Sequence, residues 1–238
     1  MIPLRDLEKR PGVPIVTALL VAANLAVWIY VLTIIGDRGA MRAFYAQWSF
    51  RADAFFRGDL SLATIAPLFT SQFLHAGWLH IAGNMLFLWV FGAAVEGKIG
   101  RIPFLAFYLL AGCVAALAQG LYLIGMGEGN VQLVGASGAI SGVLGAYLVI
   151  APTARVRALV PLGLFMTPIT LPAVIVLGEW LVLQLVSAFD LFALFGQGGN
   201  VAYFAHLGGF ATGVVVGIGV RLVARDRQRS TAEMAPQP

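Results

Sequence analysis

The sequence predicts an all-α membrane protein, a six-transmembrane-helix bundle with a long first outer loop. Three observations support this prediction. Hydrophobic residues make up 60% of the 238 residues and charged residues only 11%, whereas soluble domains typically carry about 25% charged residues. The apolar residues gather in six stretches, and the basic residues concentrate in the segments that would lie on one side of a membrane. Lipid is therefore the expected solvent for most of the surface.

Six apolar stretches are expected to cross the membrane, since a helix needs about 20 such residues to span about 30 Å of hydrocarbon. They cover residues 13–35, 78–95, 103–125, 137–151, 168–188 and 201–220. The linkers contain helix breakers, namely "RIP" at 101–103, "APT" at 151–153 and "GQGGN" at 196–200. The fourth span is short. The chain is thus expected to divide into a cytoplasmic N-terminal segment (1–12), a membrane domain (13–223) and a cytoplasmic polar tail (224–238).

The basic residues predict the orientation. Eleven of the fifteen lysines and arginines lie before the first span, after the sixth span, or in the linkers after the second and fourth spans. The other four lie in the loop 36–77, and a loop of that length obeys the positive-inside rule only weakly. Both termini are therefore expected in the cytoplasm. The same loop mixes arginines with aromatic residues, so it either lies in the headgroup region or forms an ordinary folded outer loop.

Composition argues against several classes of site. A single cysteine, Cys113, excludes an internal disulfide framework, and no cluster of Cys and His has the spacing of a metal site. We expect no cofactor and no metal. The net charge of +4 does not indicate a nucleic-acid partner, because in a membrane protein the location of basic residues matters more than their sum.

Four polar residues are predicted to share one depth in the membrane. Ser137 and His206 each lie 14 residues from the inner end of their spans, which is about 21 Å at a helical rise of 1.5 Å per residue. His80 and Asn84 lie about 22 and 16 Å above the inner end of the second span by the same measure. Polar groups at this depth are costly, so the layer is a candidate functional site.

Small residues predict that the fourth and sixth spans pack together. They recur every three or four positions, at Gly135, Gly138, Gly142 and Gly145 in one segment and at Ala205, Gly209, Gly213 and Gly217 in the other. Such stripes let helix backbones approach closely in lipid, which would bring Ser137 near His206. The alternative is packing alone, because many bundles carry similar stripes without catalysis.

Ser137 and His206 form a possible catalytic pair. A serine hydroxyl becomes a good nucleophile when a neighbouring base takes its proton, and a neutral imidazole can be that base. Ser137 opens a helix, where unpaired backbone N–H groups would stabilise an oxyanion. His80 and Asn84, four residues apart, could add donors from one face of the second span. No Asp or Glu lies in the second, fourth or sixth span, so the prediction is a Ser–His dyad.

Three motifs resemble those of rhomboid intramembrane serine proteases of the bacterial six-transmembrane type. "HAGWLHIAGN" at 75–84 resembles the family's His-x4-His-x3-Asn pattern. "GASG" at 135–138 is similar to its Gly-x-Ser-Gly nucleophile motif, and "AHLGGFATG" at 205–213 resembles its Ala-His-x-x-Gly-x-x-x-Gly pattern. The resemblance covers nearly the whole chain.

The resemblance implies roles for individual residues. Ser137 would be the nucleophile and His206 the base, with His80 and Asn84 stabilising the oxyanion. Accessory roles would fall to His75, Gly135 and Gly138, and helix packing to Gly142, Gly209 and Gly213. The implied reaction is cleavage of single-span membrane proteins at or near the outer side of the bilayer, with substrate reaching the site as the fifth span and the loop 189–200 move. The implied location is the inner membrane of a bacterial cell.

Two positions depart from the family pattern. Many relatives carry an aromatic residue four positions after the nucleophile, where this chain has Ser141, so another group must orient His206. "TIAP" at 64–67 stands where a Trp-Arg or Trp-Gln pair is common. Two other functions stay open: a rhomboid-like protein that binds membrane clients without cutting them, and a small channel or transporter that uses Glu179.

Overall fold

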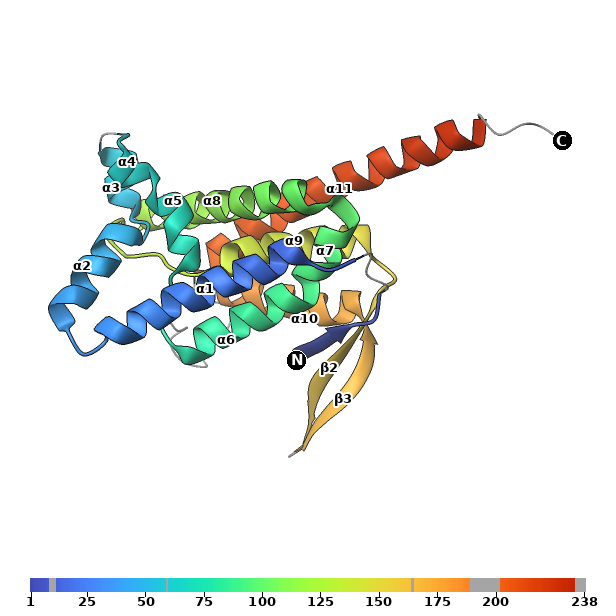
Figure 1. The fold of residues 1–238 in the computed structure, drawn as a ribbon, viewed down its shortest axis with the longest axis horizontal. Coiled ribbons are helices and arrows are strands. Elements are labelled where there is room, and N and C mark those ends of the chain that lie inside the picture. Colours follow the sequence, from blue (N-terminus) through green and yellow to red (C-terminus); the bar gives the residue numbers. More distant parts are fainter. Residues whose placement is uncertain (9–11, 59, 164, 189–201, 234–238) are drawn as a thin grey trace.

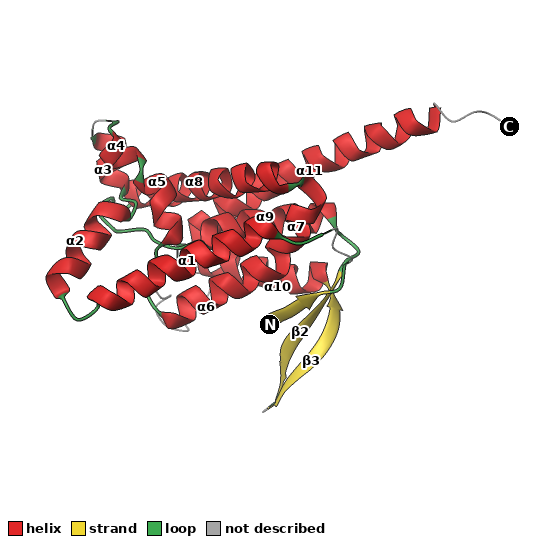
Figure 2. Cartoon of the chain, viewed as in Figure 1, coloured by secondary structure: helices red, strands yellow, loops and turns green. Residues whose placement is uncertain are grey.

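The computed structural model describes residues 1–8, 12–58, 60–163, 165–188 and 202–233, and in this part the chain is mostly helical (Figures 1 and 2). The long helices run side by side, and the C-terminal helix extends beyond the bundle at one end (Figure 1). The loop 189–200, expected to move with the fifth span, lies outside the described residues.

Four helical segments are long and apolar enough to cross a membrane among the described residues. They are α1 (Ile15–Ile34), the continuous segment Trp78–Ile99, α8 (Arg101–Gly125) and the Tyr203–Asp226 part of α11. Trp78–Ile99 consists of α6 (Trp78–Phe87), a π-helical turn η2 (Leu88–Gly92) and α7 (Ala93–Ile99). Two shorter apolar helices join them, α9 (Ser137–Ile150) and α10 (Ala173–Ala188). The protein is therefore a multi-pass integral membrane protein.

Short helices fill the segment between α1 and α6. They are α2 (Arg38–Trp48), α3 (Ala52–Arg57), α4 (Leu62–Ile65), α5 (Pro67–Thr70) and the 3₁₀ turn η1 (Ser71–Phe73). The buried ring of Phe50 anchors this segment against the bundle. Phe50 also forms an isolated β-bridge with Leu133, in the segment Leu133–Ala136 that directly precedes Ser137 and is called the strap below. This segment thus helps to position the strap.

The prediction of an all-α chain is wrong at two places. β1 (Ile2–Asp6), β2 (Arg155–Leu162) and β3 (Phe165–Pro172) form an antiparallel sheet in the order β1-β2-β3. The fifth apolar helix accordingly begins at Ala173 and not at residue 168. Pro168 and Pro172 lie in the segment that was expected to be helical, and a proline inside a helix removes a hydrogen bond and clashes with the preceding turn.

A buried carboxylate joins the first two spans. Glu96 is 3% exposed and accepts hydrogen bonds from the backbone N–H groups of Val16 and Thr17, at 3.0 and 2.8 Å, and from the Thr17 hydroxyl at 2.7 Å. These are donors of the first turn of α1, which have no acceptor within the helix. Glu96 therefore caps α1 with a negative charge at the positive end of its dipole.

The expected end of the membrane domain at residue 223 does not coincide with a structural break. Helix α11 (Tyr203–Glu233) continues through this position and leaves the bundle as a single helix (Figure 1). The boundary between membrane domain and polar tail stays a prediction from the arginines that begin at Arg221.

Candidate active site

Ser137 is the first residue of α9, and the strap before it is fixed by backbone hydrogen bonds. Leu133 and Phe50 exchange two N–H···O bonds, of 2.8 and 3.1 Å, and the Gly135 N–H donates to the Ser71 carbonyl over 2.9 Å. Gly135 has φ +125°, a conformation that side chains disfavour and glycine adopts readily. The strap therefore enters α9 by a turn that places the Ser137 hydroxyl at the helix N-terminus.

Helices α9 and α11 bring Ser137 and His206 together. The Ser137 Oγ lies 2.8 Å from His206 Nε2, although the residues are 69 positions apart in the sequence. The two backbones touch at their glycines: a Cβ on Gly209 would overlap the Gly138 carbonyl, and one on Gly213 would overlap the Gly142 carbonyl. This close contact leaves the His206 side chain 8% exposed and facing the start of α9.

The other ring nitrogen of His206 contacts α10. His206 Nδ1 lies 2.6 Å from Gln184 Oε1. Because a carbonyl oxygen only accepts hydrogen bonds, this contact assigns the proton to Nδ1 and leaves the Nε2 lone pair for the Ser137 hydroxyl. The Trp180 ring, one turn before Gln184, lies with its centroid 5.8 Å from that of His206.

Ser141 stands at the position where the resemblance described above implies an aromatic residue. Its hydroxyl donates to the Ser137 carbonyl over 2.7 Å, so it turns back onto its own helix. The aromatic ring beside His206 comes from Trp180 on α10. Contacts from α10 therefore occupy the side of His206 away from Ser137.

His80 and Gly135 lie against each other beside Ser137. A Cβ on Gly135 would lie 2.8 Å from His80 Nε2 and 3.7 Å from Ser137 Oγ. The Ala76 backbone N–H donates to His80 Nδ1 over 3.4 Å. Since Nδ1 accepts this bond, Nε2 carries the proton and is the donor that faces the strap.

Asn84 and His75 complete the polar group on and before α6. Asn84 is 8% exposed, and its Nδ2 donor has no hydrogen-bond partner among the described residues. His75 is 1% exposed, and its ring meets that of His80 edge to face with centroids 5.0 Å apart. Burial, helped by the neighbouring His80, lowers the pKa of His75 to about 4. His75 is therefore neutral at physiological pH, and its aromatic ring packs against that of His80.

Glu179 belongs to a different contact. Both of its carboxylate oxygens accept from the Met1 amino group, at 3.1 and 3.2 Å. Glu179 lies five residues before Gln184 on α10, toward the sheet. The structure thus pairs Glu179 with the N-terminal amine instead of with the Ser–His pair.

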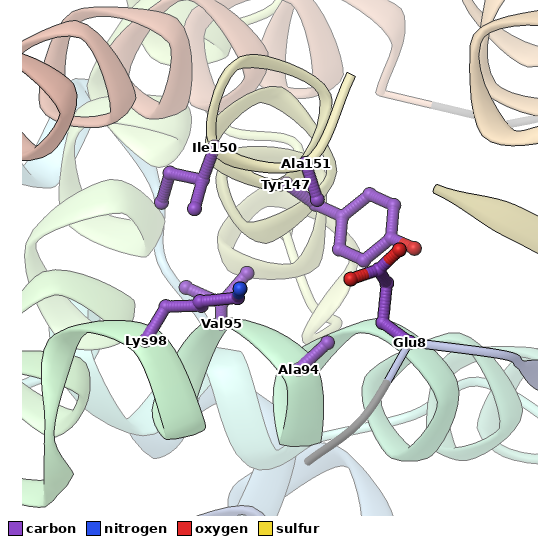
Figure 3. A pocket seen from close by; sticks show the side chains of 7 residues that line it. All are labelled: Glu8, Ala94, Val95, Lys98, Tyr147, Ile150 and Ala151. Carbon is purple, nitrogen blue, oxygen red and sulfur yellow. The ribbon is translucent and has the colours of Figure 1, made fainter. Parts of the chain in front are cut away.

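A small pocket lies at the opposite end of α9 from Ser137, and it plays no part in this site. Glu8, Lys98 and Tyr147 face it together with apolar side chains of α7 and α9 (Figure 3). Tyr147 also donates to Asp6 over 2.8 Å, which ties α9 to β1. Within the described ranges, no group of three His, Cys, Asp or Glu side chains could hold a metal ion.

Sequence reasoning did not assign Gln184 to the site. The signal was present, since Gln184 is the single amide in a long apolar stretch and polar groups in such stretches are functional candidates by default. A carboxylate is the usual partner of a catalytic histidine, and a neutral amide acceptor on the fifth span gives a weaker signal in the sequence.

The chain is similar to known proteins over most of its length. The Rhomboid domain family profile matches residues 63–222. Rhomboid protein 1, mitochondrial, of Saccharomyces cerevisiae is 31% identical over 162 residues, which cover 67% of this chain and 43% of that protein. Rhomboid-like protein 11, chloroplastic, of Arabidopsis thaliana is 30% identical over 62% of this chain and 49% of that protein. Rhomboid protease GluP of Bacillus subtilis is 40% identical over 40% of this chain and 18% of its own length. The matched region thus spans less than half of each of these relatives.

Proposed function

Because the chain belongs to the rhomboid family, we propose that it is an intramembrane serine endopeptidase with a Ser137–His206 dyad. The observation that carries this proposal is the 2.8 Å contact between Ser137 Oγ and His206 Nε2, with the His206 proton assigned to Nδ1. This tautomer is the one that general-base catalysis requires. The name of the Bacillus subtilis relative, a rhomboid protease, supports the same reaction class.

Acylation would begin when Ser137 Oγ attacks the carbonyl carbon of the scissile peptide bond. His206 Nε2 takes the hydroxyl proton as the new C–O bond forms, and the carbonyl oxygen becomes an oxyanion. The backbone N–H of Ser137, His80 Nε2–H and the unpartnered Asn84 amide are the donors proposed for this oxyanion. His206 then gives its proton to the leaving amine as the C–N bond breaks.

Deacylation would repeat these steps with water. His206 takes a proton from the water molecule, whose oxygen attacks the Ser137 ester. The second tetrahedral intermediate breaks the bond to Ser137 Oγ, which recovers its proton from His206. Neither half of the reaction needs a cofactor or metal.

The proposed substrates are single-span membrane proteins, cut at or near the outer side of the bilayer. All six apolar helices would then lie in the membrane, with α9 and α10 crossing only part of it. The excess of basic residues at the termini supports cytoplasmic termini. Location in a bacterial cell membrane remains a prediction.

Cleavage of a fluorescent single-span reporter in proteoliposomes tests the proposal. We expect the wild type to cut, and Ser137→Ala and His206→Ala at equal folded amounts to lose at least about 10³-fold in rate. Cutting by Ser137→Ala at the wild-type rate would disprove the mechanism. A wild type that binds several reporters without cutting any would instead support the client-binding function.

A further inference from the structure

We propose that Gln184 is the positioning residue for His206. The imidazole is then oriented toward the Ser137 hydroxyl only while α10 is packed against α11. This inference rests on the proposed function. Its starting point is the 2.6 Å contact between Gln184 Oε1 and His206 Nδ1. Gln184 touches neither substrate nor the reacting atoms, and it acts through the imidazole.

The contact restricts both the tautomer and the rotation of the imidazole. An acceptor at Nδ1 selects the tautomer in which Nε2 is unprotonated, and it prevents the ring from rotating away from Ser137. The Trp180 ring lies beside the imidazole and also stacks on Phe210, one turn after His206, with centroids 6.1 Å apart. Together these α10 side chains supply the support that Ser141 cannot give.

A neutral acceptor suits this position. A carboxylate at the same depth would be charged in a poorly solvated setting, and this burial of charge is costly. An amide oxygen orients the ring without that cost. The described residues include no carboxylate hydrogen-bonded to His206, so Gln184 is its acceptor there.

Gln184→Met tests the proposal because methionine keeps the length of the side chain and removes the acceptor. We expect kcat to fall by about 10²-fold, as for other small misplacements of a catalytic group, with KM changed less than about twofold. Gln184→Glu should restore most of kcat, because its carboxylate oxygen accepts the same N–H. Gln47→Met on the exposed face of α2 is the matched control.

Histidine ¹⁵N NMR provides a readout that does not depend on proteolysis. Wild-type His206 should be protonated at Nδ1 alone, and Gln184→Met should give a mixture of tautomers. A wild-type His206 protonated at Nε2, or wild-type kcat and tautomer in Gln184→Met, would overturn the positioning role. A wild type with the expected tautomer and no proteolysis would count against the proposed function only.

A second inference comes from the sheet and does not depend on the proposed function. We propose that the β2–β3 hairpin docks on anionic phospholipid at the membrane surface, at the end of the bundle opposite Ser137. Figure 1 shows the hairpin projecting away from the helices beside α10. No charged residue occurs between Arg157 and Glu179, and Leu162, Phe165 and Met166 near the hairpin tip are 53%, 77% and 48% exposed.

The base of the sheet carries unpaired positive charge. Arg5 and Arg157 are directly opposite each other in the β1–β2 pairing, and Arg155 lies two residues from Arg157 on the same face. All three are exposed, and none forms an ion pair among the described residues. Like charges directly opposite each other are destabilising, so an anion between them is the expected partner.

The backbone shows how deep the hairpin can lie. Both edges of its outer half are unpaired, because β1 reaches only as far as Leu159. Unpaired N–H and C=O groups are excluded from the hydrocarbon core but are tolerated where water is present. The apolar tip beside arginines therefore fits the headgroup region, where apolar side chains reach the upper acyl chains and arginines meet phosphates.

Spin labelling of the full chain tests this docking. We would label Phe165→Cys in a Cys113→Ala background, in nanodiscs with and without phosphatidylglycerol. We expect protection from a water-soluble relaxation agent that increases with phosphatidylglycerol and is lost in Arg155→Gln/Arg157→Gln. Arg221→Gln/Arg225→Gln on α11, at two exposed positions, is the control matched in charge and should change nothing.

Two results would overturn the docking proposal. One is a label that stays fully accessible to the water-soluble agent in both lipid mixtures. The other is protection that appears in detergent and rises with protein concentration, since this would show that a second copy pairs with the open strand edges.

Discussion

Helices α9 and α10 both contact α11, but by different means. Between α9 and α11, glycines on each helix bring the two backbones into direct contact. An added methyl group would overlap a carbonyl oxygen at three of these glycines, Gly145, Gly209 and Gly213. Between α10 and α11 side chains make the contact, namely the Gln184–His206 hydrogen bond and the Trp180 ring on His206 and Phe210. The first contact tolerates almost no displacement, whereas the second can open by rotamer changes.

This difference assigns different tasks to the two contacts. The α9–α11 contact fixes the distance between Ser137 and His206, the proposed nucleophile and base. The α10–α11 contact fixes the orientation of the His206 ring and can be released while α9 and α11 stay packed. Opening of α10 would thus free the His206 ring while the backbones of Ser137 and His206 keep their spacing.

Gly213→Ala should produce the largest loss of stability. Its Cβ would overlap the Gly142 carbonyl and lie 2.8 Å from the Ala146 nitrogen, so α9 and α11 must move apart, at a cost of about 3 kcal/mol. Reversible unfolding in detergent measures this loss. Gly219→Ala is the control, since nothing lies within 4 Å of its Cβ. Equal stability of the two variants would refute the backbone contact.

Gly135→Ala should reduce activity about 10²-fold while the protein stays folded. The added Cβ would lie 2.8 Å from His80 Nε2, and the φ of +125° is unfavourable for alanine. Cleavage of the reporter substrate measures the effect. Gly127→Ala separates strain from contact, because Gly127 also has a positive φ, +76°, but no atom within 4 Å of its Cβ. Similar losses in both variants would argue against the contact with His80.

Trp180→Leu should lower kcat by about 3- to 10-fold, because an aromatic pair contributes about 0.5–1.5 kcal/mol. The α9–α11 contact should be unaffected, so stability should change little. Initial rates at saturating substrate measure the effect, and Trp89→Leu at an exposed position of η2 is the control. A loss as large as that of Ser137→Ala would mean that α10 holds the dyad together.

Glu179→Gln should have the smallest effect. It removes the ion pair with the Met1 amine, but the Glu179 side chain is 37% exposed, and exposed pairs contribute little. We expect activity within about twofold of wild type and a stability change under about 1 kcal/mol. A cleavage assay and a thermal melt measure both. If cleavage were absent in wild type and proton flux across liposomes depended on Glu179, the transporter hypothesis would replace the protease.

The α9–α11 half of the site could be predicted from the sequence because its cause is local. Glycines at three- and four-residue intervals determine how closely two helices approach, and helical rise determines the depth of Ser137 and His206. The α10 half could not be predicted in this way. The interpretation of 168–188 as one helix ignored Pro168 and Pro172, so the start of the fifth helix was wrong. No local pattern indicated which side chains of that helix face His206.

The sheet was missed for a related reason. A short apolar run fits a buried strand as well as a helix, and periodicity alone does not separate them. The prolines at 161, 168 and 172 were the available signal against a helix. Pairing of β1 with β2 joins residues at least 150 positions apart, which no local pattern indicates.

The Glu96 cap on α1 has a consequence for the order of events during synthesis. The amide groups of Val16 and Thr17 leave the ribosome about 80 residues before the carboxylate that accepts from them, which is a delay of about 4–16 s at 5–20 residues per second. Until then the start of α1 must remain in contact with water or headgroups. The N-terminus of α1 can therefore be capped only after the segment Trp78–Ile99, which carries Glu96, has been inserted. The two helices then join the finished bundle as a pair.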